Sequence, residues 1–152
     1  MNIVDLFSGC GGFSLGFELA GFKTTCAVEH DLWAAETFSF NHPKTIVIND
    51  DIRKVKASGL NIKKGVDGVI GGPPCQGFSL SGSRDPKDPR NSLFMDFVRV
   101  VKELKPKFFV MENVPGILSM RTKNGDYVKN IIRSEFEKAH YKVCIHILNA
   151  AN

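Results

Sequence analysis

The sequence predicts an α/β fold, a doubly wound and mainly parallel sheet with helices on both faces. Short apolar runs alternate along the chain with longer stretches in which apolar residues recur every three or four positions. Glycine or acidic residues stand where most of the apolar runs end. Such alternation is typical of strand–helix–strand units, whose strands pair in parallel and present ligand sites at their carboxyl ends.

The individual elements follow from these two periodicities. Strands are expected at residues 2–6, 24–29, 45–48, 67–70, 108–111 and 141–148. Helices are expected at residues 12–20, 31–40, 93–104 and 127–139, with Asn91 as a cap for the third. The run 108–111 has no polar residue, which predicts a strand covered on both faces.

Composition places the chain among ordinary globular proteins. Its 152 residues suit one domain, and 43% of them are hydrophobic and 24% charged. No apolar run approaches the ~20 residues of a membrane span, and the start MNIVDLFSG has no secretory signal. The four cysteines form no CxxC pair, which argues against a zinc site or a disulfide scaffold and favours the reducing cytoplasm.

Charge is unevenly distributed along the chain. Residues 1–52 contain two basic side chains against seven acidic ones, although the whole chain has a net charge of +4. The asymmetry suggests a basic face for a polyanion and an acidic or neutral side for a small molecule. Solvated surface charge without a function would give the same composition.

A glycine-rich turn, DLFSGCGGFSLGF at residues 5–17, joins the first strand to the first helix. Gly9 and Gly11 allow a tight turn and the close approach of a ligand. The last glycine of the dinucleotide fingerprint is replaced by Ser14, which disfavours NAD. No Gly-Lys-Ser/Thr follows, which disfavours phosphate binding.

Acidic residues end the second and third strands. Glu29, 18 residues after Gly11, could accept both hydroxyls of a ribose. Asp51, beside Asp50, could accept from an adenine amino group while Ile52 packs on the ring. In isolation such acids are more often solvated strand ends. In this order they suit an adenosine ligand without phosphates, and S-adenosylmethionine is such a ligand.

The stretch GGPPCQGFSL places Cys75 at the exit of the fourth strand. Pro74 fixes its own φ and restricts Pro73 to extended geometry, so the thiol is aimed reproducibly. Glu112 stands at the exit of the fifth strand. If these strands are neighbours, about 4.8 Å apart, both groups face one pocket. The alternative is that Cys75 is a small packed residue.

The ordered set DLFSGCGG, VEHD, NDDI, GGPPCQGFS, NSLF and MENV resembles the N-terminal catalytic portion of DNA (cytosine-5) methyltransferases over essentially all 152 residues. The resemblance implies a Rossmann-like, S-adenosylmethionine-dependent methyltransferase sheet, truncated before its last strand. Residues 1–152 would then form an incomplete cofactor-binding and catalytic domain. It also implies a bacterial, restriction–modification setting.

The resemblance further implies a mechanism on double-stranded DNA with a flipped cytosine. Cys75 would add to C6 and form a covalent adduct, Glu112 would hold a proton at N3, and Asn113 would orient that carboxyl. The cofactor-binding residues would be Phe7, Gly9, Gly11, Glu29, His30, Asp51, Ile52, Pro74 and Leu93.

The punctuated loop at residues 79–92 resembles the mobile loop with which the family closes over DNA. The implied nucleic-acid contacts are Gln76, Ser79, Arg84, Lys87 and Arg90. An ordinary solvated loop is the alternative. At His30 the family often has an aromatic residue that stacks on adenine, and an imidazole stacks less well.

The chain ends at HILNAAN, before the QxRxR segment, the target-recognition domain and the final segment of the family. We therefore expect residues 141–148 to lack a neighbouring strand, and the chain alone to be inactive or very weak without a complementing C-terminal part. A split subunit, a fragment and a remnant all remain open. The competing functions are a portion of a tRNA cytosine-5 methyltransferase and a non-catalytic cofactor-binding module.

Overall fold

The computed structural model describes residues 1–152 except 61, 63–64, 75–92, 123–124 and 150–152. Its sheet has five strands in the spatial order β3-β2-β1-β4-β5, and every pairing is parallel. In that order the strands are β3 (Ile46–Asn49), β2 (Lys23–Glu29), β1 (Asn2–Leu6), β4 (Gly68–Gly71) and β5 (Phe108–Met111). The order changes direction between β1 and β4, where ligands bind in folds of this kind.

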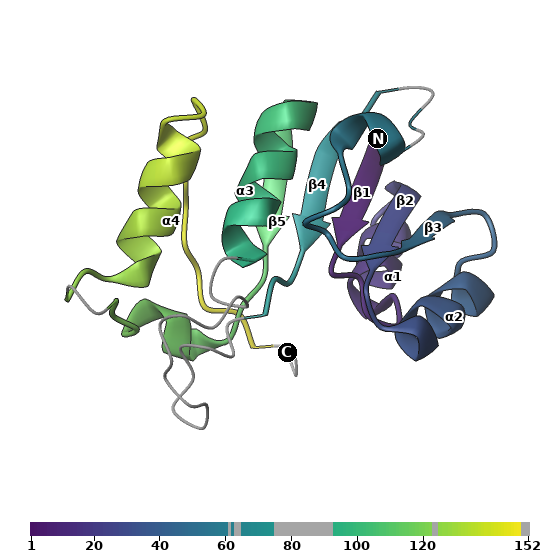
Figure 1. The fold of residues 1–152 in the computed structure, drawn as a ribbon, viewed down its shortest axis with the longest axis horizontal. Helices are drawn as coiled ribbons and strands as arrows, with labels where there is room; N and C mark the ends of the chain where they lie inside the picture. The colour runs from purple at the N-terminus through teal and green to yellow at the C-terminus, as the bar shows by residue number, and fades with distance from the viewer. Residues whose placement is uncertain (61, 63–64, 75–92, 123–124, 150–152) are drawn as a thin grey trace.

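In the described part of the chain, helices and short 3₁₀ turns lie between the strands and after β5 (Figure 1). The helices are α1 (Gly12–Leu19), α2 (Leu32–Asn41), α3 (Leu93–Leu104) and α4 (Val128–Glu137), and the turns are η1 (Ala57–Leu60) and η4 (Pro115–Leu118). The doubly wound parallel sheet is therefore confirmed, with element bounds within a few residues of those expected. Among the described helices, none is long and apolar enough to cross a membrane.

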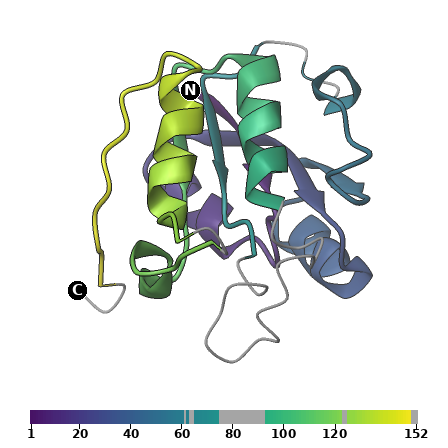
Figure 2. The same cartoon turned by 60° about the vertical axis from the view of Figure 1, so that its left-hand side comes forward.

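Successive phenylalanines of β5 show how the two faces of the sheet are covered. Phe109 stacks on Phe136 of α4 with ring centroids 3.8 Å apart, and it meets the edge of Phe97 of α3 at 6.4 Å. Phe108 points to the opposite face, because side chains alternate along a strand, and meets Phe22, which follows α1. Helices α3 and α4 stand side by side over their face in Figure 2.

Glycine at the end of β4 permits close packing of the two central strands. A Cβ at Gly71 would lie 2.1 Å from the carbonyl oxygen of Leu6 in β1. That contact is with backbone, which cannot swing aside as a flexible side chain can. The chain can therefore leave β4 toward Pro73 while staying against β1 only because this residue has no side chain.

Two expectations about the end of the chain were wrong. Residues 141–148 contain no strand. Tyr141 is held by its hydroxyl, which donates to the Pro106 carbonyl at 2.7 Å, and by its ring against Phe109. The segment does not pair with β5, which is an edge strand of the described sheet. The expected cover on both faces of β5 is incomplete, because Val110, on the same face as Phe108, is 37% exposed.

Candidate functional site

The turn between β1 and α1 contains several residues with left-handed backbone conformations. Phe7, Gly9 and Gly11 all have positive φ, at 59°, 54° and 95°. For Phe7 this is a sparsely populated conformation, of the kind found at ligand sites. A Cβ built at Gly9 or Gly12 would meet nothing within 4 Å. The side of the turn toward which these Cβ atoms would point is therefore open, as the close approach of a ligand requires.

Glu29, at the end of β2, fixes this turn with its carboxylate. One oxygen accepts from the backbone N–H of Gly9 at 2.8 Å, and the other accepts from the N–H of Asp31 at 2.8 Å. Asp31 in turn caps α2 by accepting from the N–H of Ala34. Each Glu29 oxygen keeps a further lone pair, so the carboxylate can still accept hydroxyl donors.

Asn49, the last residue of β3, links the end of β3 to the end of β2. Its side-chain amide donates to the carbonyls of Glu29 and His30 at 3.0 and 3.1 Å. Sequence reasoning missed Asn49, although its place at the end of a strand beside the acidic residues was a usable signal. The predicted stacking role of the His30 ring stays a prediction.

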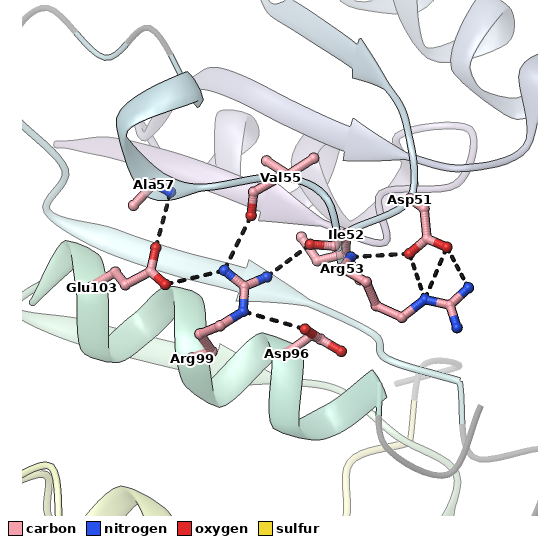
Figure 3. A network of polar contacts seen from close by, with 8 residues as sticks. All are labelled: Asp51, Ile52, Arg53, Val55, Ala57, Asp96, Arg99 and Glu103. Atoms are coloured by element: carbon pink, nitrogen blue, oxygen red, sulfur yellow. Dashed lines mark hydrogen bonds and ion pairs between the residues drawn. The ribbon is translucent and has the colours of Figure 1, made fainter. Parts of the chain in front are cut away.

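Asp51 is held by its own turn. Its carboxylate accepts from the backbone N–H of Arg53 at 3.0 Å and from the guanidinium Nε at 2.9 Å, with a further bond from Nη2 (Figure 3). Hydrogen bonding to Arg53 lowers the pKa of Asp51 to about 2. Asp51 is therefore an ionised acceptor, and the adjoining Ile52 is 4% exposed and packs in the core.

A buried polar cluster supports the glycine turn from below. The Ser14 hydroxyl of α1 donates to Asp5 of β1 at 2.6 Å, and burial raises the pKa of Asp5 to about 7. His42, at the end of α2, lies with Nε2 3.1 Å from the Gly11 carbonyl and Nδ1 3.0 Å from Glu18. Nothing in the local sequence around His42 indicates a contact with a residue 31 positions away.

The exits of β4 and β5 are joined directly. The Glu112 N–H donates to the Gly71 carbonyl at 2.9 Å, and a Cβ built at Gly72 would lie 2.9 Å from a carboxylate oxygen of Glu112. Asn113 donates its side-chain amide to the Pro73 carbonyl at 2.8 Å. The expected neighbourhood of the two strand exits is thus present, whereas orientation of the Glu112 carboxyl by Asn113 stays a prediction.

The predicted nucleophile and nucleic-acid contacts lie outside the described residues. These are Cys75, Gln76, Ser79, Arg84, Lys87 and Arg90. Pro74 and Leu93 border this interval and are each half-buried, with Leu93 beginning α3. The described part of the site therefore consists of the edge formed by the ends of all five strands.

Comparison with known proteins decides the family. A family model described as "C-5 cytosine-specific DNA methylase" matches residues 1–152. The chain belongs to this family. The family uses S-adenosylmethionine, and M.DdeI and M.NgoPII, two of its members, are bacterial type II methyltransferases.

Members of the family are similar to this chain over its whole length. The type II methyltransferase M.DdeI of Desulfomicrobium norvegicum is 63% identical over 100% of the chain and 37% of its own length. M.NgoPII of Neisseria gonorrhoeae is 47% identical over 99% of the chain and 43% of its own length. The chain therefore spans well under half the length of these two methylases.

Solved structures of similar proteins share the fold. A crystal structure of a prophage-encoded DNA modification methyltransferase from E. coli matches with a TM-score of 0.75 and 39% identity, covering 91% of this chain and 38% of that one. A DNMT2 variant of Spodoptera frugiperda matches with a TM-score of 0.67 and 26% identity, covering 91% of this chain and 41% of that one. The described sheet is thus part of a methyltransferase fold.

The residues of this edge fit S-adenosylmethionine. These residues can accept the donors of an adenosine group. Gly9 leaves space for close approach, Glu29 has spare lone pairs for hydroxyl groups, and Asp51 is an ionised acceptor. Among the residues that the structure describes, no group of three or more His, Cys, Asp and Glu side chains could hold a metal ion.

Proposed function

We propose that this chain forms the cofactor-binding and catalytic part of a type II methyltransferase that methylates C5 of cytosine in double-stranded DNA. The observation that carries the proposal is the double link between the exits of β4 and β5. Glu112 lies against Gly72, and Asn113 is bonded to Pro73. The carboxyl is thereby held beside the segment that leads directly to Cys75.

The adenosine half of the cofactor would be held along the other half of the edge. Glu29 would accept from the ribose hydroxyls while it fixes the turn through Gly9. Asp51 would accept from the adenine amino group, and Ile52 would pack on the ring. Phe7, Gly11, His30, Pro74 and Leu93 are assigned to the remaining wall of the cofactor site.

When bound, S-adenosylmethionine supplies an activated methyl group on its sulfonium. Cytosine C5 is not nucleophilic enough to take it unaided, so the thiolate of Cys75 would form a bond to C6. Glu112 would hold a proton at N3, which withdraws electron density from C6 and makes this addition feasible, and the enamine that results is nucleophilic at C5. After C5 has taken the methyl group, a base removes its proton, the C5–C6 double bond re-forms and the Cys75 thiolate leaves.

DNA recognition would come from another part of the enzyme. The chain matches 37% of M.DdeI, so the larger part of that methylase has no counterpart in these residues. We therefore propose that activity requires a complementing C-terminal part. The basic residues Arg84, Lys87 and Arg90, with Ser79 and Gln76, would contribute contacts to the DNA around the flipped cytosine.

The test is to supply the remaining part of M.DdeI, fused to this chain or as a separate polypeptide. We expect methyl transfer to duplex DNA from the assembled enzyme, and at most weak transfer from the chain alone. A duplex containing 5-fluorocytosine should give a covalent adduct, which Cys75→Ser should abolish. Glu112→Gln should slow adduct formation.

The alternatives predict different outcomes of the same experiment. An adduct with RNA and not with DNA would replace the proposed substrate by RNA. Cofactor binding without an adduct on either nucleic acid would favour a non-catalytic cofactor-binding module. Sequence-specific methylation at a normal rate by the 152-residue chain alone would overturn the need for a complementing part.

A further inference from the structure

Helix α3 reaches across to the loop that follows β3. The guanidinium of Arg99 donates to the Ile52 carbonyl at 2.8 Å through Nη2 and to the Val55 carbonyl at 3.1 Å through Nη1 (Figure 3). Both bonds join residues more than forty positions apart. The Arg99 side chain therefore holds two backbone carbonyls of the loop that follows β3.

Arg99 is itself held in place by its own helix. Its Nε donates to Asp96 at 3.3 Å, one turn before it, and its Nη1 donates to Glu103 at 3.1 Å, one turn after it. Glu103 also accepts from the backbone N–H of Ala57 at 3.0 Å, so α3 grips the loop at a third point. This grip on Ala57 is the main reason why the pKa of Glu103 is lowered.

The geometry requires a guanidinium. Arginine presents five donors in a rigid planar fork, whereas lysine has one ammonium group at the end of a flexible stem. Two carbonyls on the loop and two carboxylates on the helix can be satisfied together only by the fork. The Arg99 side chain is 32% exposed, and its bonds to the two loop carbonyls are partly buried, whereas its bond to Glu103 is exposed.

The loop that Arg99 holds is the one that presents Asp51. β3 is the other edge strand of the described sheet, so no strand lies alongside the residues that follow Asn49. The loop's own bonds are short turns, from Lys54 N–H to the Asp51 carbonyl at 2.8 Å and from Val55 N–H to the Ile52 carbonyl at 3.2 Å. It is connected to the rest of the molecule by Ile52 and Val55 in the core, by the bonds from Arg99 and by the bond from Ala57 to Glu103.

We propose that Arg99 is a positioning residue for the adenine end of the cofactor. It fixes the backbone of Ile52 so that the Asp51 carboxylate faces the exocyclic amino group of the base. Arg99 does not touch the ligand itself. The inference rests on the proposed function, because it needs the adenosine half of the cofactor to lie over Asp51 and Ile52.

The test compares two ligands that differ at the position Asp51 would recognise. S-adenosylhomocysteine has the 6-amino donor, and S-inosylhomocysteine has a carbonyl in its place. We expect the wild-type chain to bind the adenine ligand at least about tenfold more tightly, as a hydrogen bond to a charged acceptor implies. Calorimetry on the full chain gives both dissociation constants.

In Arg99→Met and Arg99→Lys we expect the preference to fall below about threefold while the thermal transition stays cooperative. If Arg99→Met does not fold, Arg99→Lys decides, because it keeps the charge and the aliphatic stem. Arg133→Met, at an exposed position of α4, is the matched control and should keep the wild-type preference. Asp51→Ala should abolish the preference directly.

The possible failures are distinguishable. A folded Arg99→Lys chain that discriminates as well as wild type would overturn the inference and leave the proposed function standing. Equal binding of both ligands by wild type would also overturn it, since Asp51 would then not read the amino group. If wild type bound neither ligand, the proposed cofactor site would fail, and this inference with it.

Discussion

The side-chain amide of Asn113 donates a 2.8 Å hydrogen bond to the main-chain carbonyl of Pro73. The bond joins the segment after β5 to the segment after β4, two positions before Cys75. Asn113 also accepts from the Val114 N–H at 3.0 Å, which fixes the amide in this orientation. The amide nitrogen therefore links the two strand exits, while the amide oxygen fixes the side chain within its own segment.

Asn113→Asp should separate catalysis from cofactor binding. The substitution replaces the donor with a carboxylate that repels the Pro73 carbonyl, while the cofactor contacts at β1, β2 and β3 remain. In the enzyme assembled with the C-terminal part of M.DdeI, we expect single-turnover methylation to slow by about tenfold or more. The dissociation constant for S-adenosylhomocysteine should change by less than about twofold. Loss of both together would show that Asn113 supports the whole fold.

Glu29→Gln should weaken cofactor binding. The carboxylate accepts from two backbone N–H groups, and an amide would turn its own NH₂ toward one of them. We expect affinity for S-adenosylhomocysteine to fall about tenfold or more in calorimetry. Glu36→Gln, at an exposed position of α2, removes the same charge and should bind as wild type. If both variants lost the same affinity for S-adenosylhomocysteine, the loss would be due to the change in net charge and not to the contacts of Glu29.

Asp5 should make stability depend on pH. Burial raises its pKa from 3.8 to about 7, so the folded chain keeps this proton where the unfolded chain has released it. The resulting stabilisation is complete below about pH 4 and is lost as the pH rises to about 7, by up to about 4 kcal/mol. Urea titrations should show this slope in wild type and in Asp50→Asn. The slope should be absent in Asp5→Asn, and parallel curves for wild type and Asp5→Asn would contradict the assignment.

Gly71→Ala and Gly16→Ala should have opposite effects. At Gly71 the new methyl group would lie 2.1 Å from the Leu6 carbonyl, so we expect a loss of about 3 kcal/mol or more in the free energy of unfolding. At Gly16, inside α1, a Cβ meets nothing within 4 Å, and alanine should stabilise by about 0.5–1 kcal/mol. Similar denaturation midpoints in the two variants would contradict the close approach of β4 and β1.

The sequence predicts local structure well because local structure depends on periodicity. Strands β1 to β5 and helices α1 to α4 lie where apolar spacing, glycines and acidic strand ends indicate. Residues 141–148 have the same apolar character but form no strand, since a strand needs a partner and apolar spacing does not reveal one. The expected cover on both faces of β5 is incomplete at Val110, since an apolar run does not show what packs against it.

The supporting residues of the site were missed for a related reason. Arg99 contacts Ile52, 47 positions away, and His42 contacts Gly11, 31 positions away. Arg99 lies on α3 between Asp96 and Glu103, a pattern that ordinarily indicates a solvated helix face. Arg99 can bond to the loop after β3 only because α3 packs beside that loop, and the sequence does not show this packing.

Because all five strands are parallel, their carboxyl ends lie at regular intervals along one edge of the sheet. Strand exits follow one another at intervals of about 4.8 Å, so the five of them span about 19 Å. Read from β3 to β5, they carry Asp51, Glu29, the glycine turn, Gly72 with Pro73, and Glu112. Adenine, ribose, methyl donor and target cytosine would be met in the same sequence. The distance between the methyl donor and the cytosine would thus depend on how many strands lie between their binding residues. One additional strand between them would move the two groups apart.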